Sequence, residues 1–183
     1  MRRVALAALV VPALVSVSCG GTGDATTTTP VVLTSPRAVN ATTAPLLPTS
    51  RFTLPQFDYA KYKALMAQLH GTPVAVNLWG AWCGPCRQEA PFLARAAKRF
   101  GRQVQFLGVD VGDPNRVEPQ VFIRDFGWSY PSVYDPPKQI LSGLGFIGPP
   151  ITMLFDRSGK LADTISGPIP SLGRLTRGLR KIA

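Results

Sequence analysis

Residues 77–91 read NLWGAWCGPCRQEAP, and they hold two of the chain's three cysteines, Cys83 and Cys86, separated by two residues. The short apolar run before them, 74–79, contains branched residues and predicts a buried strand. After them, apolar residues recur with a helical period from 86 to 100, and Gly101 ends the pattern. The stretch therefore predicts a strand, a turn and a helix, with the cysteines where the helix starts.

This position favours redox chemistry at the two cysteines. The sulfur of Cys83 should lie near unpaired backbone N–H groups at the positive end of the helix dipole, which favours the thiolate and makes Cys83 the predicted nucleophile. Cys86 is one helical turn further on, so it can form a disulfide with Cys83 or resolve a mixed disulfide. Gly84 permits close approach of a partner chain, and Pro85 suits the first turn of a helix.

A zinc site and a structural disulfide are the alternative interpretations of the pair. Zinc usually needs four ligands, and the chain has only Cys19 and a single histidine, His70, to add to the pair. A disulfide that closes so short a loop restricts little chain entropy, so stability is a poor reason for it. We therefore predict a redox-active pair, with no metal and no other cofactor.

Outward from the cysteines, strand and helix patterns alternate. An amphipathic helix over 58–69 begins at a capping residue, Asp58. Downstream, the pattern predicts a strand over 103–111, a helix over 119–126, a short strand over 130–134, two strands over 151–155 and 159–166, and a final helix over 171–182. This order predicts an α/β fold, a sheet with helices on both faces.

The first 19 residues have the layout of a secretory signal peptide. Two arginines precede an apolar run, 4–15, that is too short to span a membrane. Cys19 follows and resembles the lipobox cysteine of bacterial lipoproteins, although Ser16 stands where that pattern usually has Leu, Val or Ile. We predict lipidation at Cys19 and a location on the extracytoplasmic face of the bacterial plasma membrane, with secretion as the alternative.

Composition changes along the rest of the chain. Residues 20–50 are rich in Thr and Pro without helical period, which predicts a disordered tether. The predicted organisation is thus a signal peptide over 1–19, this tether, and a globular domain over 51–183.

The chain is basic: lysine and arginine outnumber acids 20 to 10. Such charge favours anionic lipid and acidic partners, whereas nucleic acid is disfavoured because no binding motif accompanies it and the leader predicts export.

The segment WGAWCGPCRQEAP (79–91), which includes Trp82, resembles the active site of thioredoxin-fold proteins. In particular it resembles the membrane-anchored TlpA/ResA/DsbE-like thiol-disulfide oxidoreductases, and the likeness extends over roughly 51–183. The resemblance implies a thioredoxin fold, with a central mixed β-sheet flanked by helices on both faces. We also expect a monomer.

The resemblance assigns roles to two further residues. Asn77 stands where thioredoxin has a buried aspartate, and Glu89 occupies the glutamate position of this branch. A carboxyl group buried there would have a raised pKa and could exchange a proton with Cys86. The alternative for Glu89 is an exposed glutamate that pairs with nearby arginines.

GPPITMLFDRSGK (148–160) resembles the segment of this family that carries a cis-proline, which falls on Pro150. The residue before that proline normally binds the backbone of a client peptide, but Pro149 has no N–H to donate. Either one hydrogen bond to the client is missing, or Pro149 is the cis residue.

The resemblance implies a reductase that keeps the haem-binding cysteines of apocytochrome c reduced and receives electrons from a membrane partner. Gly84-Pro85 matches the dipeptide of thioredoxin, a strong reductant. Two alternatives remain: an oxidase that forms disulfides in exported proteins, and a lipoprotein that uses the fold only for binding.

Overall fold

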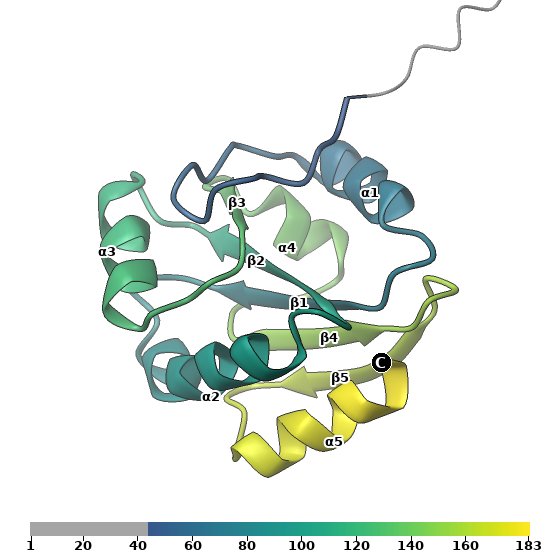
Figure 1. Ribbon diagram of the computed structural model, residues 1–183. Coiled ribbons are helices and arrows are strands. Elements are labelled where there is room, and N and C mark those ends of the chain that lie inside the picture. Colours follow the sequence, from purple (N-terminus) through teal and green to yellow (C-terminus); the bar gives the residue numbers. More distant parts are fainter. Residues whose placement is uncertain (1–43) are drawn as a thin grey trace, which may run out of the picture. The chain divides into compact units, whose positions relative to one another are not determined.

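The computed structural model describes residues 44–183, which fold around a five-stranded sheet of order β3-β2-β1-β4-β5 (Figure 1). Strands β1, β2 and β3 are parallel, whereas β4 is antiparallel to β1 and β5 to β4, so the sheet is mixed. The strands are β1 (Val74–Trp79), β2 (Gln105–Val111), β3 (Ser132–Asp135), β4 (Ile151–Phe155) and β5 (Leu161–Ser166). The helices are α1 (Tyr59–Gln68), α2 (Gly84–Phe100), α3 (Val117–Asp125), α4 (Gln139–Gly143) and α5 (Leu172–Ile182).

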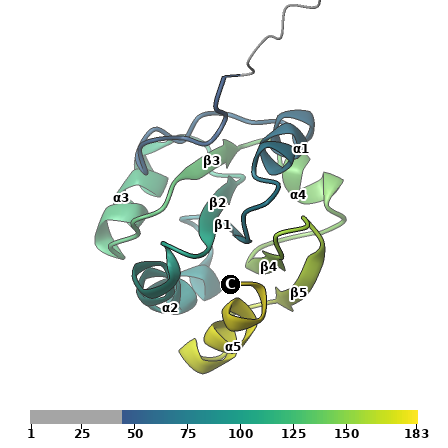
Figure 2. The same cartoon turned by 45° about the vertical axis from the view of Figure 1, so that its right-hand side comes forward.

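Helices cover both faces of the sheet, as the sequence predicted. Figures 1 and 2 show α2 and α5 side by side on one face, with α1 and α4 on the other. The central strand β1 is buried along its whole length. Its residues alternate between the two layers of the core, with Trp79 packed towards α2 and Leu78 towards the opposite layer.

Strand register brings the ends of three strands together. Trp79 lies opposite Asp110 of β2, and Leu78 lies opposite Ile151 of β4. The loop that carries the cysteines therefore leaves the sheet beside the end of β2 and the start of β4. Aromatic side chains hold α2 over this region: Trp79 packs against Phe122 and Trp128, and the Trp128 indole N–H donates to the backbone C=O of Ala90 in α2 (3.1 Å).

Most predicted elements are present with shifted bounds, and one was missed. Helix α2 starts two residues earlier than predicted, and β3 covers Ser132–Asp135 instead of 130–134. The missed helix is α4, which has only five residues and therefore no clear period. It is stabilised by the Asp135 carboxylate, which accepts the backbone N–H groups of Gln139, Ile140 and Leu141.

The packed region begins before residue 51. Leu46 and Leu47 contact the core layer beneath α1, and the Leu46 N–H donates to the side chain of Gln68 (2.8 Å). The predicted end of the tether at residue 50 is therefore wrong for these residues, because two leucines suffice to anchor a segment without periodicity. The predicted signal peptide, Cys19 and most of the tether lie outside the described residues. Within 44–183, no helix has both the length and the apolar character needed to cross a membrane.

Candidate redox-active site

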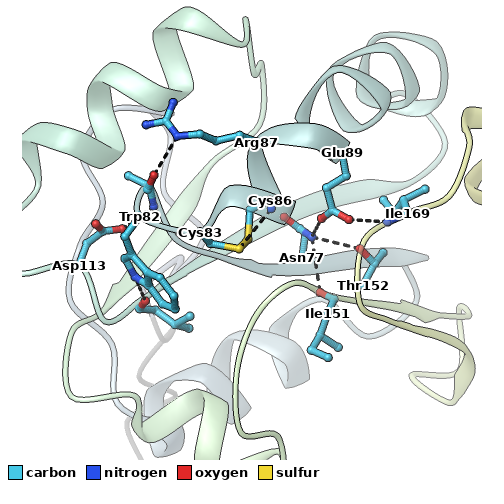
Figure 3. The surroundings of a disulfide bond; sticks show 12 residues. Asn77, Trp82, Cys83, Cys86, Arg87, Glu89, Asp113, Ile151, Thr152 and Ile169 are labelled. Carbon is cyan, nitrogen blue, oxygen red and sulfur yellow. Dashed lines mark hydrogen bonds between the residues drawn. A yellow bond between two sulfur atoms is a disulfide. The ribbon is translucent and has the colours of Figure 1, made fainter.

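Cys83 and Cys86 form a disulfide at the start of α2 (Figure 3). Cys83 is the N-cap residue of the helix, and its Sγ accepts the backbone N–H of Cys86 (3.2 Å). Pro85 occupies the first turn, and Gly84, the residue between it and Cys83, is exposed. Both sulfurs are therefore close to the N-terminal N–H groups of α2, where a negative charge on Cys83 would be stabilised.

The loop before Cys83 is held at three points by other parts of the chain. The backbone N–H of Ala81 donates to Oδ2 of Asp113 (2.7 Å), and its C=O accepts from Nε of Arg87 (3.1 Å). The indole N–H of Trp82 donates to the C=O of Val111 (3.1 Å), while 54% of the side chain remains exposed. The loop thus has a defined conformation, and its one large exposed apolar group lies next to Cys83.

Glu89 is buried behind the disulfide, although it belongs to a helix rich in arginine. Only 1% of the residue is exposed, so the alternative of an exposed, arginine-paired glutamate is wrong. Its Oε1 accepts from the side-chain amide of Asn77 (2.9 Å), and its Oε2 accepts the backbone N–H of Ile169 (2.7 Å). Burial raises the pKa of Glu89 to about 7, against the opposing effect of these two hydrogen bonds.

Asn77 lies in β1 between the carboxyl group of Glu89 and β4 (Figure 3). Its Nδ2 also donates to Oγ1 of Thr152 (3.1 Å) and contacts the C=O of Ile151 (3.5 Å). The Ile151 C=O can only accept, and the Thr152 hydroxyl and the Glu89 carboxyl oxygen act as acceptors here, which favours the amide orientation with Nδ2 towards all three. Among the described residues, Oδ1 of Asn77 has no donor, which leaves a buried acceptor close to the cysteine pair.

The proline segment lies next to the end of β1. The Pro149–Pro150 peptide bond is cis, so Pro150 is the cis residue and the alternative position at Pro149 is wrong. Pro150 is buried and directly precedes Ile151, which pairs with Leu78 near the end of β1. Pro149 therefore offers only its C=O to a chain that binds beside the cysteines.

Residues 47–164 match the protein-family model described as the AhpC/TSA family, and this span contains the disulfide, Glu89 and both prolines. The chain belongs to the AhpC/TSA family. Its matches of known structure include a DsbF homologue from Corynebacterium diphtheriae (28% identity, TM-score 0.58, covering 63% of this chain and 75% of that one). A secreted thiol-disulfide isomerase from Corynebacterium glutamicum is similar to the same degree (29% identity, TM-score 0.57, 64% and 74%). The fold is thus the thioredoxin fold that the sequence predicted.

Two curated relatives of this AhpC/TSA chain are named thiol-disulfide oxidoreductase ResA. The protein from Geobacillus thermodenitrificans is 36% identical over 104 residues, covering 56% of this chain and 59% of the relative. The protein from Bacillus subtilis is 32% identical over 103 residues, covering 56% and 57%. The chain therefore spans less than two thirds of the length of these relatives.

Sequence patterns did not predict three residues that support the site of this AhpC/TSA chain. Arg87, Asp113 and Val111 support the loop before Cys83, but two of them come from the end of β2 or the loop after it. No local pattern distinguishes Asp113 from an ordinary turn residue before proline. Only the pairing of β1 with β2 brings it within reach of Ala81.

Proposed function

We propose that this protein is an extracytoplasmic thiol-disulfide oxidoreductase that uses Cys83 and Cys86 as its redox pair. The observation that supports this most strongly is the disulfide at the first turn of α2, backed by the buried carboxyl group of Glu89. The names of the ResA relatives support the same activity.

In the reducing direction, the thiolate of Cys83 attacks a client disulfide, forms a mixed disulfide and releases one client thiolate. Cys86 then loses its proton and attacks the sulfur of Cys83, which forms the Cys83–Cys86 disulfide and releases the second client thiolate. Two electrons pass to the client, and each released thiolate takes up a proton. Glu89 is the proposed acceptor of the Cys86 proton, because a carboxyl group with a pKa of about 7 exchanges protons readily near neutral pH.

Clients are proteins with thiols or disulfides, and they bind as an extended segment across Trp82 and the Pro149–Pro150 turn. The exposed indole supplies an apolar contact, and the C=O of Pro149 accepts one backbone hydrogen bond. The hydrogen bond that an N–H at residue 149 would donate is missing.

The favoured role is reduction of protein disulfides in cytochrome c maturation, with apocytochrome c as client and a membrane protein as electron donor. The resemblance of the active-site segment to the TlpA/ResA branch and the Gly84-Pro85 dipeptide, which matches that of thioredoxin, favour this direction. A second candidate is an oxidase that forms disulfides in exported proteins. It is supported by the resemblance of the active-site segment to the DsbE-like members of the same branch.

The proposed location follows from the N-terminal sequence. Residues 1–19 direct export, Cys19 carries the lipid, and residues 20–45 tether a monomeric domain to the membrane. In a bacterial host, Cys19→Ser should move the protein from the membrane fraction to the soluble fraction outside the cytoplasm. Retention in the membrane would contradict lipid anchoring at Cys19.

The deciding experiment is the reduction potential of the Cys83–Cys86 pair. We would equilibrate the full chain carrying Cys19→Ser, which leaves only this pair, in thiol buffers. A value near about −270 mV, that of thioredoxin, supports the reductase, and a value near about −120 mV supports the oxidase. Two further outcomes separate the alternatives. A Cys83→Ser/Cys86→Ser variant that retains all activity would support the binding-only alternative. If the reduced protein did not reduce the disulfides of insulin, the reductase would be contradicted.

A further inference from the structure

A second buried acidic site lies on the opposite side of the cysteine loop from Glu89, at the end of β2. It consists of Asp110, the sixth residue of β2, and Asp113, three residues further on. Asp110 is fully buried, and Asp113 is 2% exposed. The mechanism proposed above uses neither carboxyl group.

Asp110 lacks the partners that a buried carboxylate needs. Within residues 44–183, neither of its side-chain oxygens accepts a hydrogen bond from a backbone or side-chain donor. The carboxyl group within hydrogen-bonding reach is that of Asp113. As carboxylates, the two groups could only repel each other, and a buried charge without a donor is strongly unfavourable.

The other charged or titratable groups around Asp110 are already engaged. Asp135 of β3 is another acid, and its oxygens accept three N–H groups of α4. Arg116, before α3, donates through Nε to the C=O of Leu54, and its guanidinium lies 4.4 Å from the ring centre of Tyr134. The Tyr134 hydroxyl donates to the backbone C=O of Asp113. None of them supplies a hydrogen bond to Asp110.

We propose that Asp110 is a positioning residue: it keeps its proton, uses it to donate a hydrogen bond to the Asp113 carboxyl group, and so orients Asp113 to hold Ala81 in the loop before Cys83. Asp113 is the accepting partner, because its carboxyl group already accepts the Ala81 N–H at Oδ2 (2.7 Å). Asp110 is the acid because it has no other way to satisfy its oxygens. Burial and the neighbouring acids raise the pKa of Asp110 to about 10, in agreement with this assignment.

The consequence for the redox site follows from the contacts of the loop. Asp113 and Val111 together hold Ala81 and Trp82, the two residues before Cys83. If Asp110 were ionised, repulsion would move the Asp113 carboxylate away from Ala81. Cys83 would then lose its alignment with the first turn of α2, which keeps its sulfur near the helix N–H groups.

The direct test is carboxyl NMR of the full chain carrying Cys19→Ser, with ¹³C-labelled aspartate and assignment by Asp110→Asn and Asp113→Asn. We expect the Asp110 carbon to keep the shift of a protonated acid from pH 5 to pH 8. An Asp110 carbon that titrates near pH 4 would overturn the proposal. This measurement does not depend on any redox activity, so it is informative even if the proposed function fails.

The functional test rests on the proposed function and uses the alkylation rate of Cys83 in the reduced protein. Asp110→Asn keeps an N–H donor towards Asp113, so we expect a rate within twofold of the parent. Asp110→Ala removes the donor, and we expect at least a fivefold slower reaction at pH 7. Val133→Ala, which creates a cavity in the opposite core layer, controls for lost stability.

Equal rates for Asp110→Ala and Val133→Ala would overturn the proposal, because the role of Asp110 would then be only structural. If Asp110→Ala does not fold, the pH profile of Asp110→Asn decides instead. The parent should lose Cys83 alignment near pH 10, as Asp110 ionises, and the Asn variant should lack this step. An identical alkaline step in both proteins would overturn the proposal.

Discussion

Glu89 and Asp110 are both buried carboxyl groups beside the same loop, but they differ in what they contact. Each oxygen of Glu89 accepts an N–H hydrogen bond, whereas neither oxygen of Asp110 accepts one from a donor group in the described residues. Burial raises the pKa of both, to about 7 for Glu89 and about 10 for Asp110.

The comparison shows that burial alone does not decide the role of an acid. Two donors partly stabilise the ionised form of Glu89, which brings its pKa close to neutral and suits it to proton exchange. Two acidic neighbours have the opposite effect on Asp110 and keep it protonated. One acid can therefore act as a proton carrier, and the other as a permanent hydrogen-bond donor.

The largest expected effect is that of Asp110→Asn on the pH dependence of stability. The folded protein keeps the Asp110 proton while the unfolded chain loses it above about pH 4, so Asp110 lowers the free energy of unfolding as pH rises, by about 1.4 kcal/mol per unit up to its folded pKa. The Asn variant lacks this loss. The free energy of unfolding of the Asn variant minus that of the parent should therefore rise by about 4 kcal/mol from pH 5 to pH 8, as measured by urea unfolding at each pH. Parallel stability curves would contradict the assignment of a proton to Asp110.

Glu89→Gln should also gain stability relative to the parent as pH rises, but over a narrower pH range. The raised pKa of Glu89 means that stability falls as pH rises from about 4.5 to about 7 and is then constant, a total of about 3 kcal/mol. The difference between Gln variant and parent should therefore stop changing above pH 7, whereas that for Asp110→Asn continues to grow. If the stability difference between Glu89→Gln and the parent also grew from pH 7 to pH 8, the two acids would not differ in pKa as described.

The third prediction concerns residue 149, where a proline lacks the backbone N–H that could donate to a bound client. In a Cys86→Ser background, which traps mixed disulfides, Pro149→Thr introduces one N–H beside the bound chain. One added hydrogen bond contributes roughly 1 kcal/mol, so release of a trapped client peptide by a fixed concentration of added thiol, which cleaves the mixed disulfide, should be about fivefold slower. Pro149→Ala is the matched control, since it adds the same N–H without a hydroxyl. No slowing in either variant would contradict the proposed backbone contact.

The smallest effect is expected at a half-buried acid with a cationic partner, Asp163. Arg174 binds Asp163 through two hydrogen bonds (2.6 and 2.9 Å), and this pairing lowers the pKa of Asp163. The pH dependence of stability is opposite to that of the buried acids. The ion pair stabilises the fold above the pKa that Asp163 has in the unfolded chain, and this stabilisation is lost as pH falls. Arg174→Ala should lower the free energy of unfolding at pH 7 by less than about 1 kcal/mol in urea titrations. Arg177→Ala, at an exposed position of the same helix, provides the control, and a loss for Arg174→Ala larger than about 3 kcal/mol, the total pH-dependent change expected for Glu89→Gln, would reverse the order proposed here.

Much of the site could be predicted because it is local in sequence. Helix and strand periods depend on neighbouring residues, and the spacing from Cys83 to Cys86 and Glu89 spans less than two turns of one helix. The family resemblance added the cis-proline at Pro150, whose role no local pattern reveals. The short helix α4 was not predictable because its five residues show no clear period, and the packing of Leu46 was not predictable because it depends on contacts with residues far along the chain.

The sequence by itself thus determined the strand, the turn and the helix around the cysteines, and the order of the elements that surround them. Only the tertiary structure decided what supports that loop, because Ala81 and Asp113 are 32 residues apart and meet through the pairing of β1 with β2. It also decided the surroundings that raise the pKa of the two buried acids. A side chain's pKa depends on the donors and charges that the fold brings to it, and in the sequence Glu89 and Asp110 are simply two acids.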